Sequence, residues 1–287
     1  MYMDKFKIAK IISTLTNPPI ICIPLFFIIC LCISENIGEF IVLEVISLIF
    51  ASILPMAIIL FWAKRLGTDT DISNRTDRFI PMIIGIISYF IGFLICLLLK
   101  LDNFLTILLL CYALNTGIVL IITTKWKISV HTTGLSGPVG ALILLIGPFG
   151  ALFGILYPVL IFSRVLLNKH TLAQAICGAV QGFFLTVIEI YLFVDILHIP
   201  LGNLISLDYA IFYILAIIVT PIILGFLSYL KPSGKLFALF EIIAFIIFLL
   251  LMPFDVFIIF TLISLTSILI SLYVGDDFIW YKVLTSP

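Results

Sequence analysis

The feature that most limits what this chain can fold into is a series of apolar runs, each about 20 residues long. A helix of that length crosses the apolar core of a bilayer while satisfying its own backbone N–H and C=O groups. The composition agrees, because 63% of the residues are apolar and only 10% are charged. The sequence predicts an all-α, polytopic integral membrane helical bundle. The expected single spans are 11–33, 40–62, 79–99, 103–123, 171–193, 205–229, 236–253 and 255–274.

The apolar stretch 132–163 is too long for one crossing and contains Gly147 and Pro148 at its middle. We expect a hairpin of two antiparallel helices, 132–146 and 149–163, each about 22 Å long and too short to cross the membrane fully. The hairpin brings the expected total to about ten membrane helices. The predicted organisation is N-terminal membrane helices at 1–63, a membrane core at 64–193 and extra C-terminal membrane helices at 194–287.

The charged residues balance, with fifteen basic and fifteen acidic side chains. This balance excludes the strongly basic surface that a nucleic acid would need. With a cytoplasmic N-terminus, ten spans place the basic residues of the connections on one side, apart from Lys100, as the positive-inside rule requires. We therefore expect a multi-pass protein of the cell membrane whose functional loops face the cytoplasm.

Polar residues gather around His131 on that predicted cytoplasmic face. Lys127 and Ser129 precede this histidine, and glycines follow it at the start of an apolar helix. The free N–H groups and positive dipole end of such a helix start favour an anion. Arg75 and Arg78 lie in the loop before the run 79–99, on the same side. This combination suits the binding of a phosphate group.

A second polar cluster surrounds His170. Ser163 and Arg164 precede it, and Gln174 follows four residues later on the same helix face, where its amide can hydrogen-bond the imidazole. An arginine binds phosphate oxygens bidentately, one histidine can attack phosphorus, and the other can protonate the departing alcohol. The joint spacing of the two clusters predicts cleavage of a phosphate ester or anhydride.

The spacing Ser-Arg, five residues, His, three residues, Gln resembles the third signature of the type 2 phosphatidic acid phosphatase superfamily, which ends in Asp. The segment 129–131, Ser-Val-His, is similar to the second signature, Pro-Ser-Gly-His. The resemblance implies that His170 is a nucleophile that forms a phosphohistidine and that Gln174 orients its ring. It also implies that His131 protonates the leaving group. The phosphate-binding residues that it implies are Arg164, Ser163 and Ser129.

The resemblance covers about residues 64–193, so this part is the predicted phosphatase-like core. The chain departs from the first signature of the family, which is Lys, six residues, then Arg-Pro. Asp71 stands where Lys belongs relative to Arg78, and Pro81 follows that arginine two residues late. Lys127 is proposed as the missing cation. The phosphate site is thereby extended to Arg78, Arg75 and Lys127, and we expect neither a metal ion nor a cofactor.

The predicted function is that of a membrane lipid phosphatase acting on a polyprenyl or phosphatidate-like lipid, with membrane lipids as its other partners. A Mg²⁺-dependent membrane prenyltransferase is an alternative, because Asp69, Asp71 and Asp77 resemble the Asp-rich loop of that family. A protein that binds or moves a phospholipid without cleaving it is a third possibility. The nearby pair Gly178 and Gly182 is expected to serve helix packing.

Overall fold

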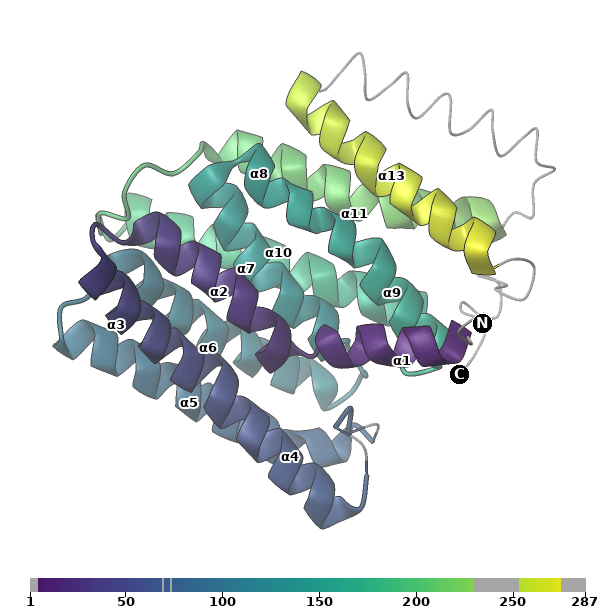
Figure 1. The fold of residues 1–287 in the computed structure, drawn as a ribbon, viewed down its shortest axis with the longest axis horizontal. Coiled ribbons are helices and arrows are strands. Elements are labelled where there is room, and N and C mark those ends of the chain that lie inside the picture. Colours follow the sequence, from purple (N-terminus) through teal and green to yellow (C-terminus); the bar gives the residue numbers. More distant parts are fainter. Residues whose placement is uncertain (1–4, 69, 73, 230–252, 275–287) are drawn as a thin grey trace.

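The structure, a computed structural model, describes residues 5–68, 70–72, 74–229 and 253–274 of the chain (Figure 1). The described elements are all helical, as the sequence predicts. Three short segments interrupt or precede longer helices: a π-helical η1 (Leu48–Ile53) and two 3₁₀ turns, η2 (Thr76–Arg78) and η3 (Leu152–Ile155). The α-helices are α1 (Lys5–Leu15), α2 (Pro18–Ile33), α3 (Ile37–Ser47), α4 (Leu54–Leu66), α5 (Phe79–Leu98), α6 (Asn103–Thr123), α7 (Val130–Ile146), α8 (Pro148–Ala151), α9 (Leu156–Leu166), α10 (Leu172–Asp195), α11 (Leu207–Tyr229) and α13 (Phe254–Val274).

Within the described residues, five helical segments are long and apolar enough to cross a membrane, or six if α1 and α2 form one bent crossing. The expected total of about ten is therefore not confirmed. Helix α7 and the stretches Leu207–Ile218 of α11 and Phe254–Ser267 of α13 are apolar but shorter. The expected span 236–253 lies outside the described residues, apart from its last residue. The five segments are Ile37–Leu66, Thr76–Leu98, Asn103–Thr123, Pro148–Leu166 and Leu172–Asp195.

The expected first span, 11–33, is not one straight helix. Helix α1 ends at Leu15, α2 begins at Pro18, and the two differ in direction by 57°. Proline suits the first turn of a helix because its missing N–H has no partner there, whereas inside a helix it removes a hydrogen bond. The break lets α1 lie across the end of α9 (Figure 1).

The stretch 132–163 reverses at the expected glycine. Gly147 ends α7 with a φ of +56°, in the region that favours glycine. The returning chain then packs directly on α7, since a Cβ at Gly150 would lie 2.3 Å from the carbonyl carbon of Leu142. The returning segment Pro148–Leu166 has 19 residues and is long enough to cross a membrane. The expectation that both arms are too short is therefore wrong for the second arm.

Helix α10 packs tightly against α7 at two glycines. A Cβ at Gly178 would lie 2.4 Å from the Thr132 hydroxyl oxygen, and one at Gly182 would lie 2.7 Å from the Ser136 Cβ. Their expected role in helix packing is therefore confirmed. Because α7 and α10 both begin at the same end of this contact, their N-terminal loops lie side by side. These loops carry His131 and His170.

Candidate functional site

The end of α9 sets the position of His170 relative to Arg164. The Arg164 carbonyl accepts hydrogen bonds from the backbone N–H groups of Lys169 and His170, at 3.0 and 3.3 Å. Asn168, with a φ of +53°, turns the chain in the left-handed conformation that commonly ends a helix. The five-residue spacing between arginine and histidine is thus the length of one helix-ending turn, which folds the histidine back beneath the arginine.

Among the described residues, the His170 ring is hydrogen-bonded at one nitrogen and has no partner at the other, which is buried. Its Nδ1 lies 3.2 Å from the Lys127 carbonyl oxygen and 3.3 Å from Gln174 Oε1. Since both partners are acceptors, Nδ1 carries the proton and Nε2 carries the lone pair. His170 is 6% exposed, and its Nε2 has no hydrogen-bond partner within the described part of the chain. A buried ring nitrogen with a free lone pair is suited to act as a nucleophile.

Burial and the charges of Arg78 and Arg164 lower the pKa of His170 to about 2. The ring is therefore neutral at neutral pH, and it does not have to lose a proton before it attacks phosphorus. The shift also indicates that several cations surround this histidine. These cations would stabilise the negative charge of a phosphate group bound among them.

Gln174 has a structural task besides its contact with His170. It forms a capping box with Thr171: Gln174 Oε1 accepts from the Thr171 N–H at 3.1 Å, and the Thr171 hydroxyl accepts from the Gln174 N–H at 3.2 Å. One amide oxygen thus serves the start of α10 and the His170 ring together. The predicted contact between Gln174 and His170 is present, and a threonine three residues before a glutamine was the sequence signal for the cap.

The loop before α7 is tied to α10 by its backbone. The Ser129 N–H donates to the Gln174 carbonyl at 3.2 Å, and the Ser129 hydroxyl caps α7 by accepting from the Thr132 N–H at 3.4 Å. Ser129 is fully buried. Its side chain therefore has a defined structural role in addition to the phosphate contact expected from the sequence, and it fixes His131, two residues later.

Arg164 and His131 meet although 33 residues separate them. The guanidinium Nη1 lies 3.5 Å from His131 Nε2, and Arg164 is completely buried. Nη1 also donates to the Ser13 hydroxyl of α1 and to Asp71 Oδ1, the latter at 2.7 Å. Helix α1 thus contributes to the site, which the sequence did not suggest.

Asp71 is a residue of this site that sequence reasoning missed. Its Oδ1 lies 3.4 Å from His131 Nε2, and its Oδ2 lies 3.4 Å from Lys169 Nζ. Burial would raise the pKa of this carboxyl group, but Arg164 and Lys169 outweigh burial and lower it. The side chain is therefore an anion among the cations that were expected to bind phosphate.

Three other predicted phosphate ligands are engaged elsewhere. The Ser163 hydroxyl donates to the Ala9 carbonyl of α1 at 2.7 Å, so its one proton is used in a helix contact. Arg75 donates to the Thr124 carbonyl at the end of α6, at 2.8 Å. Arg78 is buried and donates from Nε to the Ile72 carbonyl at 2.7 Å. Of these three, only Arg78 lines the pocket described below.

Lys127 supplies a cation next to His170. Its side chain is half-buried, and burial, together with Arg78 and Arg164, lowers its pKa to about 8. The lysine therefore keeps its charge at neutral pH but loses it in mildly alkaline solution. Its backbone carbonyl also accepts a hydrogen bond from His170 Nδ1. Lys127 therefore contributes to the site through both its backbone and its charge.

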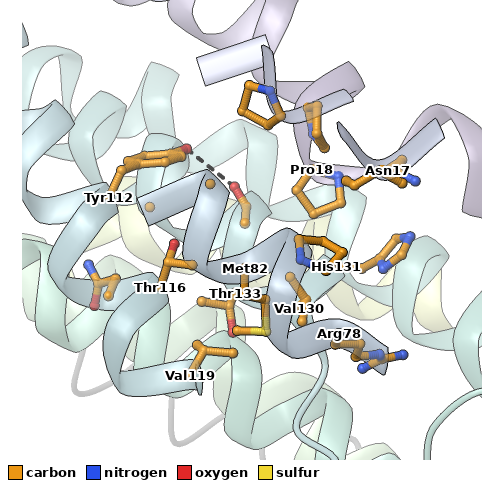
Figure 2. Close-up of a pocket in the computed structure, with 18 of the residues that line it drawn as sticks. Asn17, Pro18, Arg78, Met82, Tyr112, Thr116, Val119, Val130, His131 and Thr133 are labelled. Atoms are coloured by element: carbon orange, nitrogen blue, oxygen red, sulfur yellow. Dashed lines mark hydrogen bonds between the residues drawn. The ribbon is translucent and has the colours of Figure 1, made fainter. Parts of the chain in front are cut away.

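A pocket enters the helical bundle beside His131 and Arg78 (Figure 2), and its lining does not include His170, Arg164 or Lys127. Arg78, Asp71 and His131 lie at its polar part, and Pro18 approaches the pocket from the start of α2. The Tyr112 hydroxyl lies 3.4 Å from the Gly134 carbonyl, across the pocket wall. Most of the remaining lining is apolar or small. The lining of α5, α6 and α7 includes Pro81, Met82, Gly85, Tyr89, Thr116, Val119, Val130 and Gly137.

The chain matches no protein-family model, no curated protein and no solved structure. What the site can do therefore follows from its own geometry and chemistry.

Proposed function

We propose that this chain is a membrane lipid phosphatase that hydrolyses a phosphate or diphosphate from a polyprenyl or phosphatidate-like lipid through a phosphohistidine intermediate. The observation that carries the proposal is the His170 ring, whose Nδ1 is held by two acceptors while its buried Nε2 has no partner among the described residues. No proton has to leave this nitrogen before it attacks. The charges of Arg164 and Lys127 act on this ring and would stabilise the charge of a phosphoryl group bound to it.

The reaction proceeds in two displacements. The Nε2 lone pair of His170 attacks phosphorus, and the P–O bond to the leaving group breaks; this group is the lipid alcohol of a monoester or the polyprenyl phosphate of a diphosphate. Burial, Arg164 and Arg78 hold the pKa of His131 well below its usual range. This ring therefore takes up a proton together with the bound phosphate dianion and gives that proton to the departing oxygen. Water then attacks the phosphohistidine, the P–N bond breaks, and inorganic phosphate leaves. In the second step His131 accepts the proton of the attacking water, so each residue returns to its starting form.

The pocket supports a lipid as the substrate. One part is polar and contains His131 and Arg78, and the rest is formed mainly by apolar and small residues of α2, α5, α6 and α7. A phosphate group at the polar part would leave the attached chain in contact with Met82 and Tyr89. We further propose that the protein lies in the cell membrane with these loops on the cytoplasmic side, in keeping with the basic residues of the connections.

The prenyltransferase alternative requires carboxylates that hold Mg²⁺ through diphosphate. Among the residues that the structure describes, no group of three or more His, Cys, Asp or Glu side chains could hold a metal ion. Asp71 contacts Arg164 and Lys169, and Asp69 lies outside the described residues. Chelation separates the two mechanisms, because phosphatase turnover should persist in EDTA whereas Mg²⁺-dependent prenyl transfer should stop.

A phospholipid-binding or transport protein is the second candidate. It is favoured by the capping role of Gln174, which accounts for this residue without catalysis. Phosphate release from lipids separates a carrier from an enzyme, because a carrier leaves the phosphate ester intact.

The decisive experiment uses the full chain in detergent with phosphatidate, a polyprenyl diphosphate and an aryl phosphate. His170→Asn should abolish both phosphate release and the covalent phosphoenzyme. His131→Asn should slow release from phosphatidate by about 10²- to 10⁴-fold, but less from the polyprenyl diphosphate and the aryl phosphate, whose phosphate and phenolate leaving groups need less help from a proton. Equal and small effects of both substitutions would contradict the proposed function.

A further inference from the structure

The carboxylate of Asp71 contacts Arg164 and His131, two residues that the proposed function assigns to the phosphate group. Its Oδ1 receives a hydrogen bond from Arg164 Nη1 at 2.7 Å and lies 3.4 Å from His131 Nε2. Its Oδ2 lies 3.4 Å from Lys169 Nζ. Two oxygens of one anion thus contact a guanidinium, an ammonium and the proposed acid catalyst, which is the pattern that two oxygens of a phosphate would make.

The loop around Asp71 is built to hold the carboxylate there. The next residue, Ile72, is 4% exposed and has a φ of +43°, a conformation that a β-branched residue rarely adopts. Arg78 keeps this backbone in place by donating from Nε to the Ile72 carbonyl at 2.7 Å and from Nη2 to the Asp71 carbonyl at 3.2 Å. The surrounding structure therefore determines the position of Asp71.

Resting on the proposed function, we propose that Asp71 is an internal anion that competes with the lipid phosphate for Arg164 and Lys169. A dianionic phosphate and a carboxylate cannot share these two cations without strong like-charge repulsion. Substrate therefore binds only as the carboxylate leaves the cations. After hydrolysis the carboxylate returns to them and displaces inorganic phosphate, so Asp71 weakens binding of the product.

The test measures the binding of inorganic phosphate to the full chain in detergent, by calorimetry and by the phosphate concentration that half-maximally raises the melting temperature. Asp71→Asn keeps an oxygen that can face Arg164 but removes the competing charge. It should bind phosphate at least about tenfold more tightly than the wild type. Asp77→Asn removes a charge from the same loop and should leave the affinity unchanged, since no described cation pairs with the Asp77 carboxylate.

Loss of the carboxylate also leaves Arg164 buried without this anionic partner, so Asp71→Asn should be less stable without phosphate. Added phosphate should then raise its melting temperature more than that of the wild type, and rescue of an unstable variant by phosphate would equally support competition. Unchanged or weaker phosphate binding by Asp71→Asn would overturn the inference. If lipid phosphate is still released, the proposed function stands; if neither protein binds phosphate nor releases it from lipids, both proposals fail.

Discussion

Replacing Gln174 with alanine separates the catalytic role of this residue from its structural role. The change removes one of two acceptors at His170 Nδ1, at 3.3 Å, and leaves the Lys127 carbonyl at 3.2 Å. A net hydrogen bond contributes about 1 to 1.5 kcal/mol, which corresponds to a roughly tenfold loss of rate if it acts in the transition state. Because one acceptor remains, we expect about a tenfold fall in turnover rather than complete inactivation.

The same substitution also breaks the capping box of α10, because Gln174 Oε1 accepts from the Thr171 N–H. Loss of such a cap costs about 1 kcal/mol of stability. Thr171→Ala is the matched control, since it removes the other half of the box and leaves the contact between Gln174 and His170 in place. Phosphate release and melting temperature should be measured for both variants.

Both variants should melt at lower temperature than the wild type, but only Gln174→Ala should lose turnover at a temperature where all three proteins are folded. Gln174→Asp should retain or raise the rate, because a carboxylate accepts from Nδ1 and stabilises positive charge on the ring. Equal losses of turnover in Gln174→Ala and Thr171→Ala would refute the orienting role and leave Gln174 as a helix cap.

Further predictions concern charge, pocket and packing. The lowered pKa of Lys127 means that its charge is present below about pH 8 and lost above it, so kcat/KM should fall above pH 8 and Lys127→Arg should extend activity to higher pH. Gly85→Leu should fill the pocket and raise KM for long-chain lipids more than for an aryl phosphate, because a Cβ there meets only Tyr89, at 3.8 Å; Gly117→Leu, outside the pocket, should not. Gly178→Ala should lower the melting temperature through overpacking of about 1 to 3 kcal/mol, whereas Gly117→Ala, with open space, should change it little.

The helical character of the chain could be predicted because long apolar runs leave few other structures possible in a membrane. The bend at Asn17 was not predicted, although the pair Pro18 and Pro19 directly after it is typical of a helix start. The reversal at Gly147, in contrast, could be predicted from the sequence. A glycine followed by a proline, in a run too long for one crossing, indicates where the helix must end.

The candidate site was predicted where local spacing determines geometry and missed where tertiary contacts do. The contact between His170 and Gln174 follows from four residues along one helix. Asp71 reaches Arg164 across 93 residues, and Ser13 reaches the same guanidinium across 151. No sequence periodicity predicts such long-range contacts. Asp71 stands where the family signature has a lysine, and in the fold it is a direct partner of Arg164.

The contacts between α1 and α9 have a consequence for the time at which the candidate site can form during synthesis of the chain. The hydrogen bonds from Ser163 to Ala9 and from Arg164 to Ser13 join residues that are 154 and 151 positions apart. At about 5 to 20 residues per second, a ribosome needs roughly 8 to 30 s to make the intervening chain. During this interval α1 has no α9 to pack against. We expect the contacts of Arg164 to form only when α1 docks onto the newly made α9. The candidate site of a newly made chain would then form in one late step, after most of its apolar helices have been synthesised.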